Sequence, residues 1–169
     1  MAMAVRKAAL PHSVDLGAAL VAGIVAGVVF IVLDVTLVPL LGLGSPWEPV
    51  RMIAAIALGP SVLPPPATFD LRIFLVAMMV HFSLSSIYSV VRVVVVEGWA
   101  QSLTPLSRGL YGLVIYLVNF YGFTRFFPWF AEARGWVSIL VHVAWGMVLP
   151  IAYETLTRPG GRKAVAAPG

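Results

Sequence analysis

Five side chains capable of hydrogen bonding or proton transfer recur on one helical face in the middle of the chain. They interrupt a run that is otherwise Leu, Ile, Val, Phe and Met, at positions i, i+4, i+7, i+8 and i+11: His81, Ser85, Tyr88, Ser89 and Arg92. That spacing places them on the same side of an α-helix. In a lipid bilayer, a polar face has to be buried against protein or water. We therefore expect the segment 71–96 to lie inside a helical bundle, with its polar stripe turned toward the other helices.

Three other apolar segments each carry one strongly polar side chain, namely Asp34, Asn119 and His142. Counted from the midpoint of each expected span at 1.5 Å per residue, these three and His81 lie roughly 4–8 Å to the outer side of the membrane midplane. Ionisable groups at such depth are costly and are often functional. The sequence thus predicts one polar layer formed by these four residues. The side chains expected to support it are Ser85, Tyr88, Arg92, Tyr116 and Trp145.

The residue types leave several interpretations of this polar layer open. The simplest is a structural role, in which each histidine donates a hydrogen bond to a carbonyl, Asp or Asn of another helix and fixes the register of the bundle. A second is a proton or small-solute pathway, because a neutral histidine near a carboxylate can shuttle protons and Arg92 can bind an anion. A third is a b-type haem held axially by His81 and His142, with Gly146 making room for the ring. A fourth is a quinone in contact with the Tyr and Trp side chains.

Other metal and redox chemistry is poorly supported by the residues available. Zinc takes three or four protein ligands, and only His81, His142 and Asp34 are at hand. The chain has no cysteine, which excludes disulfides, iron–sulfur clusters, thiolate metal sites and a cysteine nucleophile. Apart from the haem hypothesis, we therefore expect no cofactor.

Signatures of soluble enzymes are also missing. The chain contains no G-x-S-x-G, P-loop, dinucleotide fingerprint or H-E-x-x-H. Ser85 lies one helical turn from His81, but such a pair on one helix more often bonds locally or to the backbone. We expect a protein that is not an enzyme.

The composition assigns the chain to the membrane class. It has 169 residues, of which 60% are hydrophobic and 11% are charged, whereas soluble domains carry about 25% charged residues. The net charge of +4 comes from basic residues at segment ends, which suits lipid headgroups better than nucleic acid. We expect an all-α membrane protein with a single domain over residues 16–157.

Four spans and one short helix account for the apolar segments. The spans are expected at about residues 16–43, 71–96, 105–125 and 135–156. The sequence Ser45-Pro46-Trp47-Glu48 has the capping-box form and starts a helix at 46–58 that is too short to span, so we expect it to be interfacial or re-entrant. A cytoplasmic lead (1–15) and a disordered basic tail (158–169) complete the chain.

Several side chains near the ends of these segments have expected roles of their own. Glu48 caps the short helix and Arg51 contacts lipid headgroups. Arg92 extends its side chain to the cytoplasmic interface. The aromatic run from Arg125 to Phe130 is typical of an interface belt.

Basic residues also predict the orientation of the bundle. With four spans, both termini lie on one side together with seven basic residues: Arg6, Lys7, Arg92, Arg108, Arg158, Arg162 and Lys163. The other side carries four: Arg51, Arg72, Arg125 and Arg134. Because loops rich in Lys and Arg stay in the cytoplasm, we expect both termini there.

Small residues mark where helices approach closely. Ala19, Gly23 and Gly27 repeat at every fourth position of the first span, a seam that serves packing within the chain or dimerisation. Gly146 follows His142 by one turn and is expected to pack against another helix.

The overall plan resembles the small four-span inner-membrane proteins of bacteria that form uncharacterised families. The matching parts are the Gly-rich first helix, the central span with a mid-membrane histidine, and the last span of the form His142-x-x-x-Gly146. The resemblance implies a multi-pass protein of the bacterial inner membrane. We expect an accessory or assembly component of a larger membrane complex or homo-oligomer, with a minimal transporter or proton-translocating unit and a haem-bearing anchor as the alternatives.

Overall fold

The fold is a helical bundle, shown by a computed structural model that describes residues 14–97 and 105–158. No strand occurs in those residues. The α-helices are α1 (Leu16–Leu40), α2 (Trp47–Leu58), α3 (Leu71–Arg92), α4 (Pro105–Leu117) and α5 (Trp136–Thr157). Short 3-10 and π segments join them: η1 (Pro60–Val62), η2 (Val93–Glu97), η3 (Val118–Gly122), η4 (Phe123–Arg125) and η5 (Pro128–Ala131). Most of the expected lead and tail lies outside the described residues.

Three helices are long and apolar enough to cross a membrane: α1, the segment Leu71–Val95, and α5. The expected third span differs from a plain α-helix. Its α-helical part, α4, has 13 residues, and the chain then continues as the π turn η3 and the 3-10 turn η4. A π turn widens the helix and loosens its regular hydrogen bonds. Here the Phe120 carbonyl accepts a hydrogen bond of 2.8 Å from Arg134 Nε, which stabilises the widened turn.

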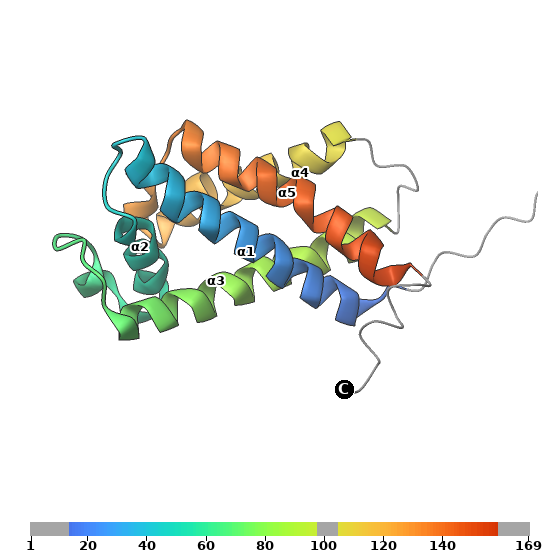
Figure 1. The fold of residues 1–169 in the computed structure, drawn as a ribbon, viewed down its shortest axis with the longest axis horizontal. Helices are drawn as coiled ribbons and strands as arrows, with labels where there is room; N and C mark the ends of the chain where they lie inside the picture. Colours follow the sequence, from blue (N-terminus) through green and yellow to red (C-terminus); the bar gives the residue numbers. More distant parts are fainter. Residues whose placement is uncertain (1–13, 98–104, 159–169) are drawn as a thin grey trace, which may run out of the picture.

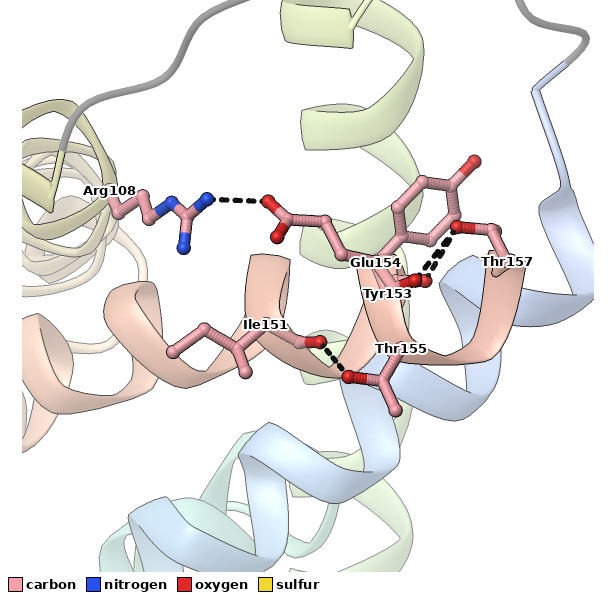
Figure 2. A network of polar contacts seen from close by, with 6 residues as sticks. All are labelled: Arg108, Ile151, Tyr153, Glu154, Thr155 and Thr157. Carbon is pink, nitrogen blue, oxygen red and sulfur yellow. Dashed lines mark hydrogen bonds and ion pairs between the residues drawn. The ribbon is translucent and has the colours of Figure 1, made fainter. Parts of the chain in front are cut away.

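Successive long helices run in opposite directions (Figure 1). The backbone N–H of Asp15, just before α1, donates to the Tyr153 hydroxyl near the end of α5 at 3.1 Å. At the same end, Arg108 of α4 forms an ion pair with Glu154 of α5 (Figure 2). The helix α2 lies at the opposite end of the bundle, on the left of Figure 1. The bundle therefore has one end built from the start of α1 and the end of α5, and another end covered by α2.

The helix α2 is held by its caps and by an apolar contact with α3. The Ser45 backbone N–H donates to the Glu48 carboxylate at 3.3 Å, the reciprocal bond that the capping-box sequence implies. Val50 and Ala54 of α2 pack against Ala77 of α3 in one buried cluster. The short amphipathic helix is thus part of the bundle's core.

The expected role of Arg51 as a headgroup contact is wrong. Its guanidinium donates to the Thr68 carbonyl at 2.9 Å and to the Val62 carbonyl at 3.1 Å, and the residue is buried. The proline-rich connector between α2 and α3 cannot supply its own regular hydrogen bonds. Arg51 satisfies two of its carbonyls and so fixes the connector to α2.

The expected extension of Arg92 to the interface is also wrong, because Arg92 is only 1% exposed. It lies three residues after Ser89, which is fully buried. The inward face of α3 therefore continues to the last residue of the helix. The stripe seen in the sequence is turned toward the bundle along its whole length.

Glycines allow two close helix crossings. A Cβ added at Gly23 would lie 2.6 Å from the Ser86 Cα, so only glycine lets α1 and α3 approach this closely. In the same way, a Cβ at Gly146 would lie 2.6 Å from the Gly112 backbone N, at the crossing of α4 and α5. Both crossings are contacts within the chain. The small-residue seam of α1 therefore serves packing against α3.

Candidate functional site

Side chains of α3 hydrogen-bond to backbone carbonyls of α1 along the whole crossing. The pairs are His81 Nε2 with the Gly27 carbonyl at 2.8 Å, Ser85 Oγ with that of Gly23 at 2.6 Å, and Ser89 Oγ with that of Ala19 at 2.6 Å. Donors spaced by four residues on one helix meet acceptors spaced by four on an antiparallel helix. A carbonyl only accepts, so His81 carries its proton on Nε2 in this bond. This half of the polar stripe therefore ties two helices together.

A second hydrogen-bond chain joins α3, η3 and α5. The Tyr88 hydroxyl donates to Asn119 Oδ1 at 2.6 Å, and Asn119 Nδ2 lies 3.3 Å from His142 Nε2. The other ring nitrogen of His142, Nδ1, lies 2.7 Å from the Ser138 carbonyl and donates to it. Nε2 of this neutral imidazole is consequently the acceptor for the Asn119 amide. The π turn η3 is the element that positions Asn119 in this chain.

Trp145 connects α5 to the first set of bonds. Its Nε1–H donates to Ser85 Oγ at 2.8 Å, while Ser85 itself donates to Gly23. Tyr111 stacks on the Trp145 ring at 5.9 Å and donates to the Tyr88 carbonyl. Ser85 is therefore shared by three helices.

Replacing Ser85 with alanine is expected to destabilise the bundle by about 1–3 kcal/mol, because the Trp145 N–H would lose its buried acceptor. The measurement is unfolding of the purified protein in mild detergent, followed by tryptophan fluorescence. Ser86→Ala is the matched control, since the Ser86 hydroxyl reaches only the Leu20 carbonyl at 3.4 Å. A loss in the control equal to that in Ser85→Ala would contradict the shared role of Ser85.

All four residues of the expected polar layer line one cavity of about 200 Å³. Its walls also include helix α2 and a set of aromatic side chains. The aromatic side chains in the walls are Phe30, Tyr88, Phe120, Phe123, Phe127, Phe130 and Trp145. An apolar pocket with a few convergent polar groups is the usual form of a small-molecule site.

Asp34 lies further along the cavity than His81. His81 is bonded to Gly27, and Asp34 follows Gly27 by seven residues, which is about 10 Å along a helix axis. Asp34 is therefore displaced toward the α2 end of the bundle. The expected thin layer is better described as the wall of an elongated cavity.

Asp34 also differs from the other three residues in its bonding. It is 8% exposed, and within residues 14–97 and 105–158 the structure gives its carboxylate no hydrogen bond or ion pair. The side chains of His81, Asn119 and His142 are all hydrogen-bonded. The cavity thus has one acidic group whose hydrogen-bonding capacity is not used by the chain.

The residues present do not fit a haem. The Phe30 ring packs against both histidines, with centroid distances of 5.2 Å to His81 and 4.8 Å to His142. His81 Nε2 is also engaged by the Gly27 carbonyl. A bis-histidine haem needs a nitrogen of each ring free and the macrocycle between them. In the part of the chain that the structure describes, no group of three or more His, Asp and Glu residues is arranged for a metal ion either.

Part of the expected aromatic belt covers the cavity instead. Trp129 Nε1 donates to the Met52 carbonyl of α2 at 3.0 Å, while Phe127 and Phe130 line the cavity. Phe126 is exposed, as expected for a residue that faces lipid. The segment 123–131 and α2 thus form the outer wall of the site.

The remaining supporting residue, Tyr116, is buried beside the cavity. Its ring packs against Phe120 at 5.0 Å and against His142 at 5.6 Å. Phe30 and Ser138 were not predicted, and Trp129 was predicted only as part of the interface belt. A signal for Phe30 is that it lies one helical turn before Asp34 on the same face of α1.

Comparisons with family models, with curated proteins and with solved structures give no match to this chain. The functional argument therefore rests on the cavity and its side chains. The resemblance in plan to small four-span inner-membrane proteins stays a prediction.

Proposed function

We propose that this chain is a four-span integral membrane protein that binds a small, largely apolar solute in the cavity between its helices, as a minimal transporter does. The observation that supports this most is the cavity of about 200 Å³ with Asp34, His81, Asn119 and His142 in its walls. A cavity of about 150 Å³ already accepts benzene. A solute with about the size of one substituted aromatic ring therefore suits this site.

The proposed topology adds the helical segment 105–125 to the three membrane-length helices. In the proposed topology, α2 lies on the side opposite to the start of α1 and the end of α5, as an interfacial or re-entrant element. Without the two buried arginines, Arg92 and Arg51, the proposed topology has six basic residues on the side of the termini and three on the side of α2. The proposal accordingly keeps both termini in the cytoplasm and the protein in a bacterial inner membrane.

Solute binding is favoured over a proton relay by the pattern of hydrogen bonds. Proton transfer over a distance needs a connected series of donors and acceptors. Among the described residues, no direct hydrogen bond joins Asp34 to the chain formed by Tyr88, Asn119 and His142. In this proposal Asp34 therefore acts separately from that chain.

The alternatives from the sequence have less support. An accessory or homo-oligomeric role relied partly on the small-residue seam. Gly23 and Gly27 of that seam pack against α3 of the same chain, so they are not available to a second copy. A hydrolytic role would need His81 to accept the Ser85 proton, but both side chains are bonded to α1 carbonyls. We propose a protein that is not an enzyme and whose immediate environment is the lipid bilayer.

Filling the cavity tests this function. In phosphatidylcholine nanodiscs, the wild-type protein is expected to bind benzyl alcohol saturably, above the partitioning measured in empty discs. Ile56→Trp replaces an aliphatic side chain in the α2 wall of the cavity with a larger aromatic one. It is expected to abolish that binding. Saturation-transfer NMR gives the measurement.

Ile24→Trp is the matched control, since Ile24 lies exposed on the outer face of α1. Ile53→Trp fills the cavity from a second position on α2 and guards against a folding defect in the first variant. Wild-type binding no greater than that of empty discs would contradict the proposal. So would unchanged binding in both cavity-filling variants.

A further inference from the structure

The Asp34 carboxylate is the group of the cavity best placed to bind a ligand. It is 8% exposed, lines the cavity, and has no hydrogen-bond or ion-pair partner among the residues that the structure describes. A buried carboxylate without a partner is costly, and a bound cation or a proton removes that cost. The side chain is therefore placed to receive a positively charged donor.

Arginines at the same end of the bundle do not supply that charge. Arg51 donates to the carbonyls of Val62 and Thr68. Arg134 donates to the Phe120 carbonyl and lies over the Tyr121 ring at 4.2 Å. Arg72 and Arg125 have exposed side chains. Among the described residues at this end, no basic side chain neutralises Asp34, which leaves the carboxylate available to a positively charged ligand.

The other polar groups of the cavity offer little to a ligand. The Asn119 amide is bonded to His142 and Tyr88, and His81 Nε2 is bonded to α1. The rest of the cavity wall is apolar. It includes aromatic side chains, such as Phe30 one turn away, Phe127 and Phe130, and aliphatic side chains of α2, such as Ile53 and Ile56. Aromatic faces attract cations. The site therefore combines one anionic group with an apolar, partly aromatic wall.

From this combination we infer that the cavity selects a small lipophilic amine, with its ammonium group at Asp34 and its hydrocarbon body among the aromatic side chains. The inference rests on the proposed function and names its solute class. Benzylamine, which is a cation at neutral pH, has a suitable size for about 200 Å³. Benzyl alcohol has almost the same shape without the charge.

Comparing these two compounds tests the inference. In phosphatidylcholine nanodiscs, the wild-type protein is expected to bind benzylamine about tenfold more tightly than benzyl alcohol. Asp34→Asn is expected to lose this preference. Asp70→Asn is the matched control, because Asp70 is an exposed carboxylate at the same end whose capping bond to the Ile73 N–H an asparagine can also make. The control is expected to retain the wild-type preference.

The outcomes separate the inference from the proposed function. Equal wild-type affinities for the two compounds would overturn the amine inference and leave solute binding intact. A preference that survives in Asp34→Asn would also overturn it. Binding of neither compound would overturn both. The comparison in the wild-type protein decides the question even if Asp34→Asn fails to fold.

Discussion

Replacing Gly112 with alanine is expected to produce a large loss of stability for the addition of one methyl group. A Cβ at this position would overlap the His142 carbonyl oxygen and lie 2.8 Å from its carbon. Both atoms belong to the backbone of α5 and cannot move aside as a flexible side chain can. Overpacking of this kind costs about 1–3 kcal/mol or more. The measurement is the unfolding transition of the purified variant in detergent.

Gly109 provides the control, because it precedes Gly112 by less than one turn on the same helix. A Cβ there would come no closer than 3.5 Å to another atom, the Cγ1 of Val143. Gly109→Ala is therefore expected to leave the transition unchanged or slightly raised, since alanine favours helix. Equal losses in the two variants would show that α4 and α5 do not cross at Gly112.

Asn119→Leu is expected to have the second large effect. The substitution keeps a side chain of similar size but leaves the Tyr88 hydroxyl and His142 Nε2 without partners. Two buried polar groups left unsatisfied cost about 2–5 kcal/mol together. The free energy of unfolding in detergent, measured by denaturant titration, gives the size of the loss.

A double-mutant cycle shows whether the loss comes from the hydrogen bond. His142→Phe removes the imidazole and keeps an aromatic ring that packs on Tyr116 and Phe120. In the Asn119→Leu background this second change is expected to cost less than it does alone, since the polar partner is already gone. Strictly additive losses would contradict a coupled pair.

The long apolar helices and the inward face of α3 could be predicted from the sequence. Hydrophobic length identifies α1, α3 and α5, and the spacing of His81, Ser85 and Ser89 identifies the face that meets α1. Periodicity reports which side of one helix is polar, and it needs no knowledge of the neighbours. Periodicity predicted the inward position of His81, whereas Asp34, Asn119 and His142 were predicted to point inward because a polar group is costly in lipid.

Contacts between distant segments could not be predicted in this way. The bond from Arg51 to the connector, the contacts of the Phe30 ring with both histidines, and the cover around Trp129 depend on how helices pack against one another. The offset of Asp34 from His81 along α1 could not be predicted, because counting from span midpoints takes no account of how α1 and α3 are shifted relative to each other. Arg92 was placed at the interface by its charge, although its position on the stripe pointed inward.

The central claim is that the polar cavity is accessible to water and solute, and that its polar side chains do more than hold the helices together. Because the chain has no cysteine, single substitutions report on one position each. Leu84 lines the cavity, whereas Ile87, less than one turn further along α3, is exposed on the outside of the bundle. In proteoliposomes, Leu84→Cys is expected to react with 2-aminoethyl methanethiosulfonate about tenfold faster than Ile87→Cys, since only a hydrated thiol ionises readily. Benzyl alcohol is expected to slow the reaction of Leu84→Cys alone. Equal and slow reaction at both positions would contradict the account, because it would mean that the cavity is closed to water and solute.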